Sequence, residues 1–158
     1  MPNTQSMCTS FLGEVLTATH NFGTAPIRAA STADTFKAAL YLASATVNAS
    51  TTVYSTTGEV TGTNYTAGGV TVTNATAPLS SNTSATAGTA YWTPSASITF
   101  TNVTLSTAFD AVLIYNSTQS NKAVSVHTFG SQTVTAGTFT LTMPSNTTST
   151  ALLRLATT

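Results

Sequence analysis

The most regular pattern of apolar and polar positions lies in the second half of the chain. Residues 109–115 are apolar at every position except Asp110, so both faces of this segment are suited to burial. A strand that is apolar on both faces is normally central in its sheet. A polar stretch follows at residues 116–121, and residues 123–129 then alternate, as the second strand of a hairpin does. The pattern predicts a central β-hairpin with Leu113 in the core.

Weaker patterns predict the other elements. Apolar residues at helical spacing predict one amphipathic helix over residues 6–20, with Ser10 as a candidate N-cap. Residues 35–42 alternate as a strand, and residues 78–88 have the low complexity of a flexible link. Residues 43–57 are interpreted as a loop and residues 58–69, with four glycines, as tight turns. Further short strands are predicted at residues 70–75, 91–92, 97–104, 132–135, 138–143 and 151–156.

The spacing of these strands predicts the fold class. Strands recur about every ten residues with turn residues between them, which is typical of sandwiches and jelly rolls rather than of βαβ units. We therefore expect an all-β chain: an antiparallel β-sandwich, jelly-roll-like, with one short N-terminal helix. Residues 1–158 would form a single domain, in which residues 1–32 hold the helix and its connecting segment and residues 33–158 form the sandwich.

Composition changes the expected surface. Only 5% of the residues are charged, four basic and four acidic, and about a quarter of the chain is threonine, a good strand former. The sequence has no basic patch for nucleic acid and no apolar run long enough to span a membrane, so neither is expected as a partner. A surface with so little charge gives little protection against association. We therefore expect a homo-oligomer, a trimer, with the helix over residues 6–20 as the contact.

One set of residues deserves weighing as a hydrolytic site. If Asn116 pairs with Asn121, the hairpin register puts Asp110 opposite His127, with Ser125 on the same face. A catalytic interpretation would make Ser125 the nucleophile, His127 the base and Asp110 its orienter. Ser125 lies in mid-strand, however, without a strained turn or a glycine-rich oxyanion loop, and its hydroxyl would stand beside the imidazole without meeting it. The expectation is a structural Asp110–His127 contact and no catalytic residue.

Other candidate groups give weaker signals. His20 and His127 could share a metal, but neither has Cys, Asp or Glu at ligand spacing, so no metal and no cofactor are expected. His20 is expected in the last helical turn. Cys8, the only cysteine, is interpreted as a small apolar residue rather than a reactive thiol. Tyr91 and Trp92 could stack on a sugar, although adjacent strand residues face opposite ways and only one of them is expected to be exposed.

Four stretches carry a resemblance to a known family. TFKAALY at residues 35–41, EVTGTNYTAGG at residues 59–69 and AVLIYNSTQSNKAV at residues 111–124, with MCTSF at residues 7–11, resemble a family of small structural proteins of tailed bacteriophages. The family is built on an antiparallel β-sandwich. Asn64 stands where a glycine is expected, and asparagine is the next most tolerant residue of left-handed backbone. The resemblance implies a component of the virion.

The expected function is therefore structural. The chain would decorate or cement the capsid by protein–protein assembly, with the major capsid protein or other virion proteins as partners, and it would be located in the virion. The first alternative is a tail, head–tail or fibre-attachment component of the same particle. The second is a carbohydrate-binding β-sandwich module, which would need an exposed aromatic platform. An enzyme is not expected.

Overall fold

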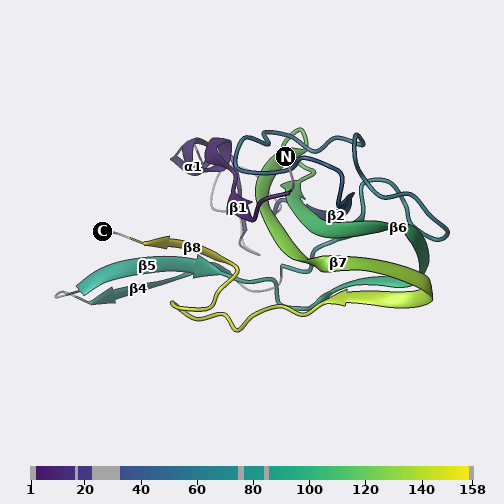
Figure 1. Ribbon diagram of the computed structural model, residues 1–158. Helices are drawn as coiled ribbons and strands as arrows, with labels where there is room; N and C mark the ends of the chain where they lie inside the picture. The colour runs from purple at the N-terminus through teal and green to yellow at the C-terminus, as the bar shows by residue number, and fades with distance from the viewer. Residues whose placement is uncertain (1–2, 17, 23–32, 75–76, 84–85, 157–158) are drawn as a thin grey trace.

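The computed structural model describes residues 3–16, 18–22, 33–74, 77–83 and 86–156. The described chain is mostly β-structure, arranged as two antiparallel sheets (Figure 1). The larger sheet has the strand order β1-β7-β6-β2-β3, and the smaller has the order β4-β5-β8. The elements are β1 (Ser6–Met7), α1 (Thr9–Leu16), β2 (Phe36–Leu42), β3 (Val70–Thr71), β4 (Leu79–Thr83), β5 (Thr86–Trp92), β6 (Ile98–Asn116), β7 (Lys122–Leu141) and β8 (Leu153–Ala156).

The predicted central hairpin is confirmed as β6 and β7, the two longest strands. β6 lies between β7 and β2, and Leu113 on it is 0% exposed. Ser120 and Asn121 in the connecting turn both have positive φ, the backbone that the tightest hairpin turns require. Both strands run further than predicted, because the expected strands at residues 97–104, 132–135 and 138–143 are continuations of the hairpin.

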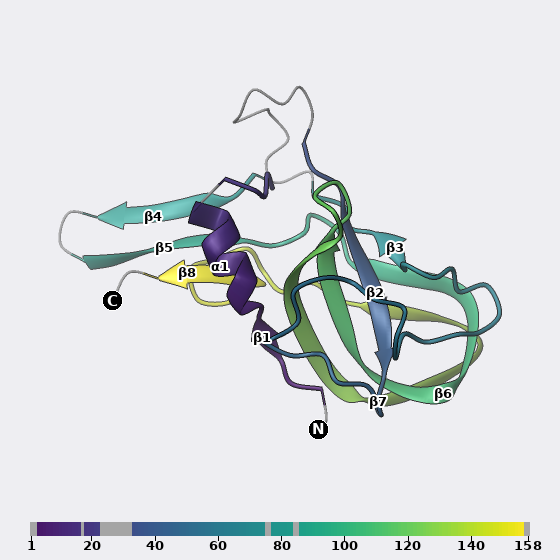
Figure 2. The ribbon, with the colours of Figure 1, turned by 90° about the horizontal axis from the view of Figure 1, so that it is seen from above.

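The hairpin bends strongly along its length (Figure 2). The register between β6 and β7 shifts repeatedly from Phe100 to Ala111, and such bulges bend a strand and increase its twist. Aromatic side chains meet along this part of the hairpin: Phe109 lies 5.0 Å from Phe139 and 6.0 Å from Phe129 between ring centroids. The bulges thus let one long hairpin wrap around part of its own core.

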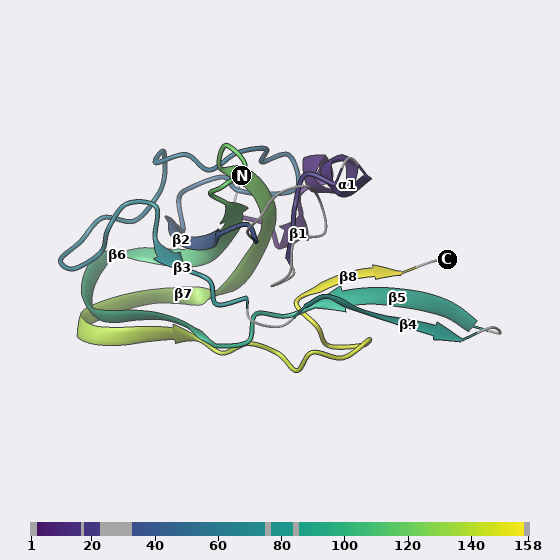
Figure 3. The same ribbon diagram turned by 180° about the vertical axis from the view of Figure 1, so that it is seen from behind.

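The smaller sheet, which we call the arm, extends away from the larger one (Figures 1 and 3). Leu79 of β4 pairs with Tyr91 of β5, and Trp92 of β5 pairs with Leu153 of β8. The prediction of a flexible link at residues 78–88 is therefore wrong wherever the structure describes that segment. Its polar, low-complexity sequence lacks the alternation that marks a half-buried strand, but β4 and β5 pair with each other as neighbouring strands and the distant β8 completes their sheet.

The helix prediction for residues 6–20 is wrong in its extent. Ser6 and Met7 form β1, which pairs with β7 through Met7 and Ser125, and α1 is only the eight residues Thr9–Leu16. The predicted boundary between a helical segment, residues 1–32, and a sandwich, residues 33–158, adjoins residues 23–32, which lie outside the described residues. β3 is likewise shorter than the strand predicted at residues 70–75.

Candidate functional site

The hairpin register separates Asp110 from Ser125 and His127, the other two residues considered as a hydrolytic site. Asn116 pairs with Lys122 rather than with Asn121, and Val112 rather than Asp110 lies opposite His127. The turn is one residue longer than predicted, and a bulge beside it shifts the register again. The predicted Asp110–His127 contact is therefore wrong.

Asp110 and His127 each have another partner. The Asp110 carboxylate accepts a hydrogen bond from the side-chain amide of Asn3, which ties the N-terminal segment to the sheet. The Ser125 hydroxyl lies 2.9 Å from His127 Nε2, so the expectation that these two side chains would not meet is also wrong. Side chains two residues apart on a strand share a face, and suitable rotamers bring their ends together. The structure joins two members of the set and leaves out the third.

Burial governs what the Ser125–His127 pair can do. Ser125 is 1% exposed, and burial lowers the pKa of His127 to about 4. The imidazole is therefore neutral at pH 7 and a weak proton acceptor, poorly matched to general-base work near neutrality. A hollow of about 240 Å³ lies beside the pair, lined by residues of β1, β7 and β8. The geometry is that of a buried hydroxyl and a partly buried imidazole that satisfy each other.

A second polar cluster joins helix α1 to the start of β7. The Glu14 carboxylate lies 2.6 Å from Lys122 Nζ and 2.7 Å from His20 Nε2. Burial by itself would raise the pKa of Glu14, but the hydrogen bonds from Lys122 and His20 hold it below the usual range. His20 lies beyond the end of the helix and not in its last turn as predicted. We call Glu14, His20 and Lys122 the clasp.

The clasp continues into a buried network at the hairpin tip. The Asn116 amide lies 3.1 Å from His20 Nδ1 and donates to Asp34 at 2.8 Å. Asp34 also accepts from the backbone N–H of Asn21 and from the side chain of Gln119. Burial lowers the pKa of His20, although the neighbouring carboxylate of the clasp acts in the opposite direction. The network fastens segments before β2 to the turn between β6 and β7.

A third cluster surrounds Glu59, which is 6% exposed. Its carboxylate accepts hydrogen bonds from the hydroxyls of Tyr54 (2.6 Å) and Tyr65 (2.8 Å) and from the backbone N–H of Gly68 (2.8 Å). Burial and the neighbouring carboxylate raise the pKa of Tyr65. Gly69 follows at a φ of 69°, and a Cβ there would lie only 1.8 Å from a backbone oxygen of β2. The cluster holds the glycine-rich turns close against the sheet.

The glycine-rich turns also contain Asn64, which stands where the phage-protein resemblance leads us to expect a glycine. Asn64 has a φ of 60°, so asparagine does adopt the left-handed backbone expected of a glycine there.

These clusters share one feature that sequence reasoning missed. Glu14, Asp34 and Asp110 each accept hydrogen bonds from side chains far away in the sequence, whereas the donors to Glu59 lie five to nine residues away along the chain. Nothing in the local sequence distinguishes these four acids from solvated surface charges. Their small number could have indicated this role. Four acidic residues contribute little to solubility, so each of them is a candidate for a structural hydrogen bond within the fold.

The structure also places Cys8 and bears on the expectations about metal binding and membrane spanning. Cys8 is 0% exposed, and burial together with the charge of Glu14 raises the pKa of its thiol to about 11, which favours the protonated thiol at neutral pH. Within the described part of the chain, no three His, Cys, Asp or Glu residues gather so as to hold a metal ion. No helix in that same part is both long and apolar enough to cross a membrane.

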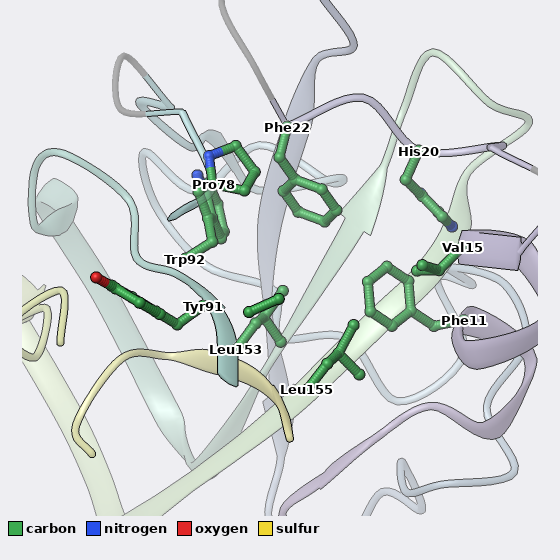
Figure 4. A pocket seen from close by; sticks show the side chains of 10 residues that line it. Phe11, Val15, His20, Phe22, Pro78, Tyr91, Trp92, Leu153 and Leu155 are labelled. Carbon is green, nitrogen blue, oxygen red and sulfur yellow. The ribbon is translucent and has the colours of Figure 1, made fainter. Parts of the chain in front are cut away.

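An apolar groove of about 230 Å³ lies between helix α1 and the arm (Figure 4). Phe11 and Val15 of α1 face Leu153 and Leu155 of β8 across it, and Trp92 lies at its inner end. Trp92 is 2% exposed and packs against other aromatic rings, while Tyr91 is half-buried. Trp92 belongs to the core, as expected of one of the two residues, but Tyr91 is not exposed and lines the same groove. The exposed tryptophan platform that a sugar-binding site would use is missing here.

The comparisons with known proteins add no relative. No protein-family model matches the chain, and neither a curated protein nor a solved structure matches it significantly.

Proposed function

We propose that this protein is a structural component of a tailed-bacteriophage virion that decorates or cements the capsid by protein–protein assembly. The proposal takes its biological setting from the resemblance of residues 35–41, 59–69 and 111–124 to small phage structural proteins. The major capsid protein and other virion proteins would then be its partners.

The observation that carries an assembly role is the arm. Of the three large hydrophobic side chains exposed on the described chain, Leu79 and Leu155 lie on the two outer strands of the arm, β4 and β8. The arm buries Trp92 and Leu153 in the core of its own chain but leaves one leucine exposed at each margin. Such a surface is typical of a site that another protein covers.

The internal use of the acidic residues also supports an assembly role. The carboxylates of Glu14, Asp34 and Glu59 are engaged by hydrogen-bond donors of the same chain. The exposed residues of the described chain are mainly threonine and serine, which bind a partner by shape and backbone pairing rather than by charge.

The β-sandwich is part of this proposal. The bend in the β6–β7 hairpin gives the larger sheet two halves that could serve as the two layers of a small sandwich around Phe109 and Phe139. The jelly-roll connection of those layers stays a prediction.

Labelling of intact particles tests the proposed function. An antibody raised against the purified protein is applied to purified phage particles and viewed by electron microscopy. Label over the whole capsid surface is expected. Label confined to one vertex or to the tail would favour the tail, head–tail or fibre-attachment role. Particles that carry no label and contain no copy of the chain by mass spectrometry would overturn the virion assignment.

A further inference from the structure

The outer edge of strand β4 is the least protected strand edge on the described chain. β4 is the first strand of the arm sheet, and β5 is the strand that pairs with it (Figure 2). The strand carries no charged residue, and its first residue, Leu79, is 47% exposed. An uncharged edge strand with an exposed apolar side chain is open to pairing with a further strand.

The other sheet edges of the described chain are protected. β1 and β3 contain two residues each, too few to support a new strand. β8, at the other margin of the arm, carries the exposed charged side chain of Arg154. The distal part of β7 is distorted by repeated register shifts, and bulges blunt an edge. The register of β4 with β5 is regular from Leu79 to Ser81 and shifts once, between Ser81 and Thr83, so the regular part of this edge is three residues long.

A second copy of this chain is the partner that fits this edge. The chain has no net charge, so two copies do not repel each other as they approach. Antiparallel pairing of β4 with β4 is self-complementary about a two-fold axis, which closes the assembly at two copies. It also doubles a three-stranded sheet and draws the exposed Leu79 of each copy into the contact.

We propose that two copies associate by antiparallel pairing of their β4 strands, so that the two arms form one continuous sheet. The inference rests on the proposed assembly function and names the partner of the arm as a second copy. In this proposal strand β4, rather than helix α1, makes the contact between copies, and the assembly is a dimer rather than the trimer expected from the sequence.

The mass of the purified protein in solution tests the pairing. Size-exclusion chromatography with light scattering at micromolar concentrations is expected to give a dimer that dissociates on dilution. Leu79→Lys places a charge at the edge and is expected to weaken the dimer by about tenfold or more. Val53→Lys is the matched control, because Val53 is 46% exposed on the larger sheet's side of the molecule, and it should leave the dimer unchanged. The fluorescence of the buried Trp92 checks that each variant is folded.

Disulfide trapping locates the contact. Single cysteines at positions 79, 80 and 81 are oxidised gently, and one of them is expected to form a disulfide-linked dimer efficiently because symmetric antiparallel strands bring equivalent residues together. The native Cys8 is buried, so the unmodified chain gives the background. Thr71→Cys, on the exposed edge strand β3, is the control position.

The results separate this inference from the proposed function. A monomer, or an oligomer that Leu79→Lys does not weaken and that no cysteine in β4 traps, would overturn the pairing. Label on the phage particle would still support the virion role in that case. A dimer trapped through β4 with no label on any particle would support the pairing and overturn the virion role.

Discussion

Replacing Leu113 with alanine is expected to lower the free energy of unfolding by about 3–4 kcal/mol. Leu113 is 0% exposed on β6, with Ala39 of β2 paired on one side and Val126 of β7 on the other. The substitution removes three carbon atoms from the core, which costs about 2 kcal/mol in transfer free energy. The cavity adds about 1–2 kcal/mol, because strands held in register on both sides cannot close around it.

Urea unfolding measures this change. The single tryptophan, Trp92, is 2% exposed and lies 4.7 Å from the ring of Phe22, so its fluorescence reports loss of the core. Val53→Ala is the control: its side chain is 46% exposed, and the expected cost is about 0.5 kcal/mol or less. A loss for Leu113→Ala no larger than that of the control would refute the placement of β6 at the centre of the sheet.

Three further predictions concern buried polar groups. The free energy of unfolding is expected to be highest above pH 6.5 and to fall as the pH drops toward 4. Burial lowers the pKa of His20 and holds that of His127 at about 4, so the unfolded chain takes up protons at a higher pH than the folded chain does. Urea midpoints at stepwise lower pH measure this change, and midpoints that do not vary with pH would contradict it. His127→Gln should remove part of that pH dependence and leave association unchanged. The contrary result would be that the wild-type protein hydrolyses an ester and that both His127→Gln and Ser125→Ala abolish this hydrolysis, which would show that the pair has a chemical role. Glu59→Gln is expected to lower the free energy of unfolding by about 1–3 kcal/mol, because the carboxylate accepts three hydrogen bonds from the turns around it. A variant as stable as the wild type in urea would mean that other contacts hold those turns.

The sequence by itself determined the elements whose local pattern and tertiary environment agree. β2 follows the alternation predicted for residues 35–42, and the hairpin follows from apolar residues on both faces of residues 109–115. Both strands are buried on both faces, β2 at Phe36 and from Ala38 to Tyr41, so the apolar positions of the sequence are the positions that pack in the core. The glycine-rich turns are of the same kind, since a positive φ at Gly68 and Gly69 is a local requirement.

Tertiary structure alone decided the arm, the register and the place of the acidic residues. β4 and the start of β5 are polar and show no alternation, so the pattern along the chain does not predict them. In the fold they pair as a hairpin, and β8, far along the chain, completes their sheet. The register of the hairpin depends on one additional turn residue and a bulge, which apolar patterning does not encode. Glu14 and Glu59 look like ordinary surface charges in the sequence. Glu14 is held by Lys122, which only the folded chain brings to it. Glu59 is held by hydrogen-bond donors in the turns around it, which apolar patterning does not reveal.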